Sequence, residues 1–313
     1  MANVTIDRPP VTLDSLRGDP GRKRKERGVR GLFQAAATLA IVISALIVFS
    51  LIREAWTFIS EVEWKTLWTD GWFPRRGIYD IKTLVVTSIM VTVIAMAVAV
   101  PLGMGAAVYL SEYARPRVRK LLKPALEVLA GIPSVVLGFF ALTFLSPELV
   151  QRFFSDARQS NITAAGIGVG ILLIPLIASI AEDAMRSVPD ALREASYGMG
   201  ARKATTSIKV VIPAAVSGLV AAFIIAVSRA IGETMVVFIA GGRSGGALFS
   251  LDPLEPGLTM TAAMASQASG TDQVKGAGLT FQSLFFVGLL LFVVTLSLNL
   301  LADRFVRRVR QKY

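Results

Sequence analysis

The sequence of 313 residues contains neither cysteine nor histidine. Without these residues the chain cannot form disulfides, use a thiol nucleophile or build the usual zinc and haem ligand sets, although carboxylates remain able to bind ions. It also lacks a G-x-x-x-x-G-K-[ST] run, the loop with which many proteins bind nucleotide phosphates. We therefore predict that the chain is no enzyme and has no metal, cofactor or ATPase site of its own.

Charged residues are also scarce. They make up 18% of the chain, whereas 53% of the residues are hydrophobic and the mean hydropathy is +0.60. Several apolar runs reach the roughly 20 residues that a helix needs to cross a bilayer. The composition predicts an all-α integral membrane protein, and the runs predict six transmembrane helices at about residues 31–52, 83–110, 124–146, 162–184, 211–241 and 280–303.

The basic residues indicate which side of the membrane each loop occupies. The segments 53–82, 147–161 and 242–278 hold 9 of the 33 Lys and Arg residues, whereas the two tails and the loops 111–123 and 185–210 hold 23. Cytoplasmic loops carry the excess of Lys and Arg, so both termini are predicted to be cytoplasmic. The basic tail before the first run has no small-residue cleavage site, which favours a retained signal anchor. The net charge of +11 then reflects topology and not nucleic-acid binding.

These features divide the chain into four parts. Residues 1–30 are a basic cytoplasmic N-terminal tail, and residues 31–82 contain the first transmembrane helix and a Trp-rich external segment. Residues 83–303 form a core of five transmembrane helices that contains the loop 185–210, and residues 304–313 are a basic cytoplasmic tail. The external segment holds all four tryptophans, Trp56, Trp64, Trp68 and Trp72. Tryptophan rings favour the headgroup layer, so this segment anchors the chain in the membrane or docks an extracytoplasmic partner.

Two shorter patterns concern packing. Gly166 and Gly170 form a G-x-x-x-G pair inside the fourth predicted helix, which favours close approach to another helix. Residues 259–269 are mildly apolar but too short to span a bilayer. They predict a re-entrant segment or an external cap.

Arg229 and Glu233 lie four residues apart inside the fifth predicted helix. An ionisable group at membrane depth costs at least about 2.5–3.5 kcal/mol, so it normally pairs, faces a polar cavity or handles a charged solute. At this spacing the two side chains share a helix face, and we predict that they pair and line the route of an anion, for which the planar Arg fork is well suited. The alternative is an ion pair that locks two helices together.

The loop 185–210 is more ordered than a connector needs to be. Ser187 to Asp190 resembles a capping box with Pro in the first turn, and Gly198 and Gly200 permit a sharp turn before a second helix. Helical spacing predicts two opposite stripes on this helix. The apolar stripe consists of Val188, Ala191, Leu192, Ala195 and Met199, and the polar stripe consists of Asp190, Arg193, Glu194 and Tyr197. This protrusion either rests on the inner face of the helices or binds a partner.

The same loop resembles a known family. Glu194-Ala-Ser, Gly200 six residues after the Glu, Val210 and Ile212-Pro213 are similar to the EAA motif of binding-protein-dependent ABC importer permeases of type I. The departures are conservative and are Ser196, Val210 and Ile212. In that family the motif couples the permease to an ATP-hydrolysing subunit. The resemblance implies that the ATPase-coupling residues here are Glu194, Ala195, Gly200 and Pro213.

Further stretches resemble the PstC family of phosphate permease subunits, although the PstA family shares several of them. They are residues 127–140, the pair Glu182-Asp183 and residues 229–234, within a similarity that covers most of the chain from Gly71 onward. The resemblance implies a multi-pass subunit of the bacterial inner membrane that translocates inorganic phosphate past Arg229 and Glu233. It leaves Glu127, Glu182 and Asp183 as structural or gating candidates.

The resemblance also implies partners. These are a PstA-like second permease, two copies of a PstB-like subunit that binds ATP and Mg, and a PstS-like phosphate-binding receptor. The EAA pattern identifies the class of transporter and not its substrate, so the alternative that the chain is a permease for sulfate or molybdate remains. A self-sufficient channel or secondary transporter is a third reading, although we find no duplicated half-repeats in the sequence.

Overall fold

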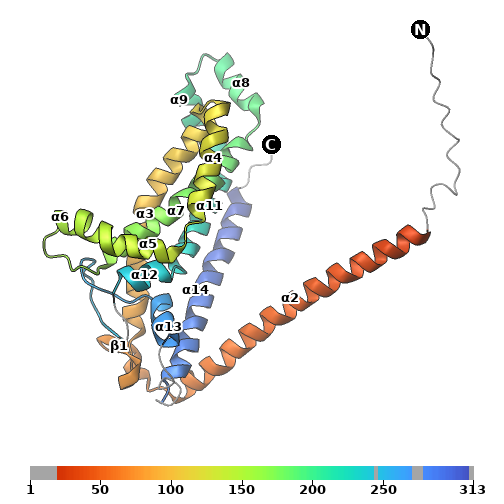
Figure 1. Cartoon of the computed structure of the whole chain (residues 1–313). Coiled ribbons are helices and arrows are strands. Elements are labelled where there is room, and N and C mark those ends of the chain that lie inside the picture. The colour runs from red at the N-terminus through yellow and green to blue at the C-terminus, as the bar shows by residue number, and fades with distance from the viewer. Residues whose placement is uncertain (1–19, 243–245, 270–277, 310–313) are drawn as a thin grey trace, which may run out of the picture. The chain divides into compact units, whose positions relative to one another are not determined.

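Figure 1 shows a computed structural model of the chain, which describes residues 20–242, 246–269 and 278–309. Most of these residues form helices, and a few form one small sheet. The chain divides into two units, Met1–Arg53 and Glu54–Tyr313, which we describe separately.

The first unit contains most of helix α2 (Pro20–Glu61). Between Lys25 and Glu61 this helix is long and apolar enough to cross a membrane. Its large apolar side chains are exposed on every face, as Leu32 and Ile41 illustrate. A helix that is apolar all round suits a lipid environment, which agrees with the first predicted span.

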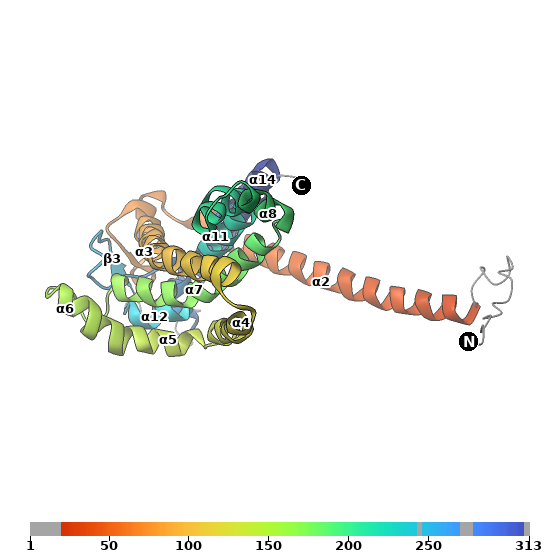
Figure 2. The same cartoon turned by 90° about the horizontal axis from the view of Figure 1, so that it is seen from above.

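The second unit is built around α3 (Ile81–Val108) and α7 (Ile162–Arg186), which lie side by side in Figures 1 and 2. The predicted G-x-x-x-G pair is at their contact. A Cβ atom on Gly166 would come within 2.7 Å of the Ile94 side chain, and one on Gly170 within 2.9 Å of a backbone oxygen of α3. The two glycines therefore allow the close helix packing that the sequence predicted.

The third predicted span is displaced along the chain. Residues 116–130 form a separate helix, α4 (Pro116–Ala130), which ends before Gly131 and Pro133. The apolar stretch follows as α5 (Ser134–Phe140), a π-helical segment (Ala141–Val150) and α6 (Gln151–Phe153). The prediction of 124–146 was wrong because proline disfavours helical backbone in the residue before it, so the span begins only at 134.

The fifth predicted span, 211–241, is bent and interrupted. Two elements lead into it, α9 (Lys203–Thr206) and a π-helical segment (Ser207–Val211), and the span itself consists of α10 (Ile212–Ala214), α11 (Val216–Ile231) and α12 (Met235–Ala240). The part before Ala214 and the part after Val216 form an angle of 71°. In the described residues, five helices are long and apolar enough to span a membrane, or six if this bent pair is one span. The last of them is α14 (Thr280–Val309).

A small sheet lies at the opposite end of the second unit from α8 (Asp190–Gly198) and α9 (Figure 1). It has the order β2-β1-β3, with antiparallel pairing of β1 (Gly71–Phe73), β2 (Ile78–Tyr79) and β3 (Ala247–Leu248). The tryptophans do not behave alike, because Trp72 on β1 is buried against Tyr79 while the other three are exposed. Trp72 is therefore a core residue and no interfacial anchor.

Helix α13 (Met260–Ala268) occupies most of the segment predicted to be re-entrant or a cap. It packs against α12, α14 and α3. The hydroxyl of Thr259 accepts a hydrogen bond from the Ala262 N–H and so caps its first turn. Its length of nine residues and its buried side chains identify it as a short helix held inside the unit.

Candidate functional site

The loop 185–210 forms the predicted protrusion. Helix α8 (Asp190–Gly198) is followed by Gly200 with φ +78°, a left-handed conformation that favours glycine, and then by α9. The predicted capping box is wrong, because the Ser187 hydroxyl donates to the Ala184 carbonyl at 2.7 Å and so belongs to the end of α7. The residue before α8 is Pro189, and it makes no side-chain cap.

The faces of α8 differ from the predicted stripes. Leu192, Arg193 and Ser196 are half-buried and face the rest of the unit, whereas Ala191, Glu194, Ala195 and Met199 are exposed. Met199 is 88% exposed. The prediction placed Arg193 on the stripe opposite Leu192, but its guanidinium contacts a buried carboxylate, so Arg193 and Leu192 both face the rest of the unit.

That carboxylate belongs to Glu112, in the π-helical segment (Tyr109–Tyr113) that ends α3. One nitrogen of Arg193 lies 3.0 Å from Glu112 Oε1, and both side chains are largely buried, at 14% and 3% exposure. The sequence reasoning missed this pair. The sequence feature that could have indicated it is Glu112 itself, the single acidic residue beside five basic residues in the segment 111–123.

The four predicted coupling residues occupy two places. Glu194, Ala195 and Gly200 are exposed on the protrusion, and Pro213 is exposed in α10, next to the bend before α11. The protrusion is tied to its neighbours because α8 also packs on the segment Ser207–Val211.

A second buried carboxylate, Glu182, joins α7 to α4. Glu182 is fully buried and lies 2.7 Å from a guanidinium nitrogen of Arg119 and 2.8 Å from Lys123 Nζ. Arg186 approaches it to 3.8 Å, and Lys123 also donates to Asp183 at 2.5 Å. The structure therefore brings the predicted Glu182 and Asp183 into one cluster of charges.

The charges of this cluster affect Lys123. Partial burial lowers its pKa, but the hydrogen bonds to Asp183 and Glu182 and the charges of both carboxylates together outweigh burial, so the pKa of Lys123 is raised above 10.5. Glu127, one turn further along α4, is exposed and borders a recess of about 350 Å³ beside Lys123. The recorded ion pairs of the described residues do not include Glu127.

Arg229 and Glu233 do not form the predicted pair. Helix α11 ends at Ile231, so the two residues no longer share one helix face. Glu233 is buried and its carboxylate accepts a long hydrogen bond, 3.4 Å, from the Val236 N–H at the start of α12. Arg229 is exposed, and among the described residues the structure records no ion pair for it.

The break between α11 and α12 is held from a third helix. Thr261 on α13 donates its hydroxyl hydrogen to the Glu233 carbonyl at 2.8 Å. Next to Arg229, the Ser228 hydroxyl donates to Asn299 on α14 at 3.1 Å. These contacts fix the position of the helix break, and neither of them uses the guanidinium of Arg229, for which the structure records no hydrogen bond to another described residue.

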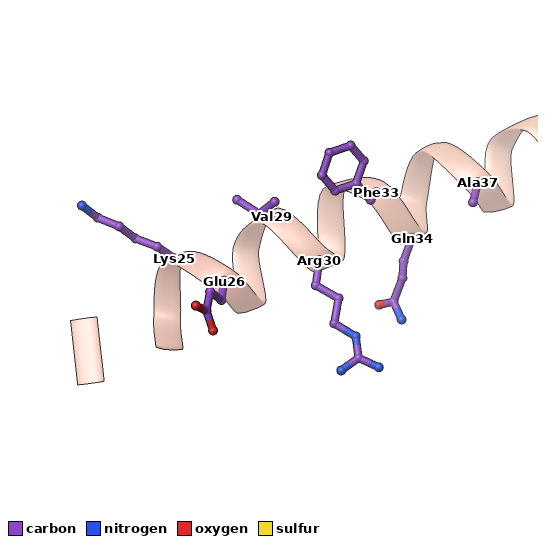
Figure 3. A pocket seen from close by; sticks show the side chains of 7 residues that line it. All are labelled: Lys25, Glu26, Val29, Arg30, Phe33, Gln34 and Ala37. Carbon is purple, nitrogen blue, oxygen red and sulfur yellow. The ribbon is translucent and has the colours of Figure 1, made fainter. Parts of the chain in front are cut away.

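A larger recess of about 680 Å³ lies along α2, in the first unit. Figure 3 shows that its seven lining side chains all come from this single helix. A recess with walls from one helix does not enclose a ligand, so we assign it no function. No group of three or more acidic residues suited to a metal ion occurs in the described residues.

Comparisons with known proteins agree on one family. The sequence pattern of the family described as "Binding-protein-dependent transport system inner membrane component" matches residues 99–311. The chain is 34% identical to the "Probable ABC transporter permease protein YqgH" of Bacillus subtilis, over 69% of this chain and 72% of that protein. It is 31% identical to the "Phosphate transport system permease protein PstC" of Mesorhizobium japonicum, over 88% of each.

A solved structure shares the fold. It is a chain of a bacterial ABC transporter involved in the import of the acidic polysaccharide alginate, with a TM-score of 0.61, 15% identity, and coverage of 92% of this chain and 100% of that one. This similarity concerns the fold alone. With the family pattern covering more than half of its length, the chain belongs to the binding-protein-dependent transport system inner membrane components, the permease subunits of ABC importers.

Proposed function

We propose that this chain forms the path for inorganic phosphate in an ATP-driven importer of the bacterial inner membrane, together with a PstA-like second permease. Two PstB-like subunits would bind ATP and Mg, and a PstS-like receptor would deliver phosphate. Support for the cargo comes from the PstC relative, which matches 88% of the chain. Taken as one span, the bent helix pair would bring the number of spans to six, and together with the Lys and Arg excess of the two tails this supports a cytoplasmic position for both termini.

The outward face of α8 is the observation that carries the ATPase contact. Ala191, Ala195 and Met199 are exposed there although they are apolar, and Glu194 lies among them. A helix that simply rested on its own chain would bury such residues. An exposed set of small and apolar side chains on a polar-rimmed helix suits insertion into a groove of another protein.

The transport path passes Arg229. Its guanidinium is exposed and is not neutralised by Glu233, so its planar fork remains able to donate two hydrogen bonds to phosphate oxygens. Glu233 keeps the break between α11 and α12 in place and thereby positions Arg229. Glu182 and Asp183 act at a gate, because they hold α4 against α7.

Reconstitution tests this proposal. The tagged chain is expressed with its chromosomal neighbours, and the bound chains are identified after purification and placed in proteoliposomes. We expect an ATP-binding subunit and a second permease in the sample, and ATP-dependent phosphate uptake that excess sulfate or molybdate does not reduce. Ala195→Asp, which places a charge on the outward face of α8, is expected to release the ATP-binding subunit, whereas Lys209→Gln is the control.

Two results would contradict the proposal. Competition by sulfate or molybdate would assign the cargo to another oxyanion. Phosphate flux through the purified chain alone, without ATP or partners, would favour a self-sufficient channel or secondary transporter.

A further inference from the structure

Arg193 is the most fully bonded side chain of the protrusion. A guanidinium has five N–H groups, and all five of Arg193 are used. Nε and Nη2 each donate one hydrogen bond to the Glu112 carboxylate, at 3.4 and 3.0 Å. The others go to the Met185 carbonyl at 2.8 Å, the Val188 carbonyl at 2.7 Å and Asp190 at 3.1 Å. Every donor of this side chain therefore has a partner.

These five bonds join three elements. Glu112 belongs to the end of α3, the two carbonyls belong to the end of α7 and the turn after it, and Arg193 itself belongs to α8. The carbonyls at a helix C-terminus lack partners within the helix, so a cation there is favourable. The guanidinium of Arg193 thus caps the C-terminus of α7 and also links α8 to α3.

A second contact ties the other helix of the protrusion to the same place. Lys203, at the start of α9, lies with Nζ 5.2 Å from the centre of the Tyr113 ring. Tyr113 and Glu112 are neighbours in the segment Tyr109–Tyr113. Both halves of the protrusion are therefore attached to the end of α3 by a cation.

We propose that the Arg193–Glu112 pair is the joint through which a displacement of α8 moves α3. The proposal rests on the function above, in which an ATP-binding subunit grips the outward face of α8. Arg193 and Glu112 are positioning residues and do not themselves contact the ATP-binding subunit, because their charged groups point into the unit. Since α3 packs along α7 for most of its length, a rigid joint carries the movement into the helical core.

Glu112→Gln tests the joint without touching the face of α8. It is made in the complete complex in proteoliposomes, where phosphate moved per ATP hydrolysed is measured. We expect this ratio to fall at least about fivefold, the lower end of typical coupling between sites, while the ATP-binding subunit stays bound. Arg193→Lys keeps the charge but has only three donors on a flexible stem, and is expected to lose coupling partly. Lys209→Gln, at an exposed cation of the neighbouring segment, is the matched control.

Distance measurements separate a joint from a merely stabilising pair. The chain has no cysteine, so spin labels can be placed at Leu102→Cys on α3 and at Tyr197→Cys on α8, which are both exposed and lie outside the residues assigned to the ATPase contact. In the wild-type complex the distance between these labels should not change when ATP is added. In Glu112→Gln it should change or broaden on ATP addition, because α8 then moves without α3.

The outcomes are distinct. An unchanged phosphate-to-ATP ratio and an unchanged label distance in Glu112→Gln would overturn the joint and leave the proposed function intact. A wild-type complex without an ATP-binding subunit would overturn the function itself. If Glu112→Gln does not assemble, the same two measurements on Arg193→Lys decide the matter.

Discussion

Two regions of the second unit handle charge in opposite ways. Near the protrusion, the buried carboxylates of Glu112 and Glu182 are each paired with cations from another helix. At the break between α11 and α12, the buried carboxylate of Glu233 bonds to a backbone N–H, and Arg229 is exposed without a recorded ion pair in the described residues. Paired charges of the first kind hold helices together, whereas a cation with free donors is available to an anion.

The contrast has a consequence for mutations. Removing one member of a buried pair leaves the other charge uncompensated, so the first region should respond in stability and in coupling. Removing Arg229 breaks no ion pair among the described residues, so the second region should respond in transport alone. Variants from the two regions can therefore show whether the comparison holds.

The largest effect is expected at Glu182. Glu182→Gln leaves Arg119 and Lys123 beside a buried neutral group. Because these cations are 28% and 24% exposed and Lys123 keeps Asp183, we expect a cost of at most about 3–5 kcal/mol, the value typical of breaking a fully buried pair. We expect a clearly lower unfolding temperature in detergent and a loss of contact between α4 and α7. Circular dichroism during heating measures the first effect.

Asp183→Asn is the matched control for Glu182→Gln. Asp183 also bonds to Lys123, but its side chain is 62% exposed, and an exposed pair contributes about 0–1 kcal/mol. Equal destabilisation by the two variants would show that burial does not decide the strength of this cluster.

The next effect is expected at Arg229. Hydrogen bonds to charged groups contribute about 1.5–3 kcal/mol, so Arg229→Gln should reduce ATP-dependent phosphate uptake about tenfold or more. The variant should insert, assemble and unfold like the wild type, because Arg229 is exposed. Uptake of labelled phosphate by proteoliposomes, together with a melting curve, measures both properties.

Glu233→Gln sharpens the same test. A glutamine oxygen can still accept the hydrogen bond from the Val236 N–H, so the helix break should persist and uptake should change little. Wild-type transport in Arg229→Gln would exclude Arg229 from the path. A strong loss in Glu233→Gln would instead show that the negative charge takes part in transport.

Local patterns predicted the parts of this molecule that depend on neighbours in the sequence. Gly200 marks a sharp turn because it supplies a left-handed conformation, and Gly166 and Gly170 mark a close helix contact because they lack side chains. The resemblance of residues 194–213 to the EAA motif identified the family, which the comparisons confirm. The roles of the individual coupling residues stay predictions.

Contacts between distant parts of the sequence were out of reach. Glu112 and Arg193 are separated by 81 residues, and periodicity placed Arg193 on the solvent side because it weighs only polarity. The spacing of Arg229 and Glu233 predicted a pair on the assumption of an unbroken helix, but the helix ends at Ile231. The i, i+4 spacing rule applies only where the helix that it assumes is unbroken.

The smallest effect concerns pH and the tie between α4 and α7. Because the pKa of Lys123 is raised in the folded chain, its contribution to stability is present below the ordinary lysine value of 10.5 and is lost as the pH rises through the higher, folded value. Labels at Leu121→Cys on α4 and Ser187→Cys at the end of α7 should therefore keep their distance from neutral pH to just below 10.5 and separate only above it. Lys123→Gln should remove this alkaline step, whereas Lys120→Gln, at an exposed lysine of the same helix, should retain it. Separation of the labels that begins near neutral pH would mean that the cluster is too weak to hold α4, and the contrast between the two charged regions would then rest on Glu112 alone.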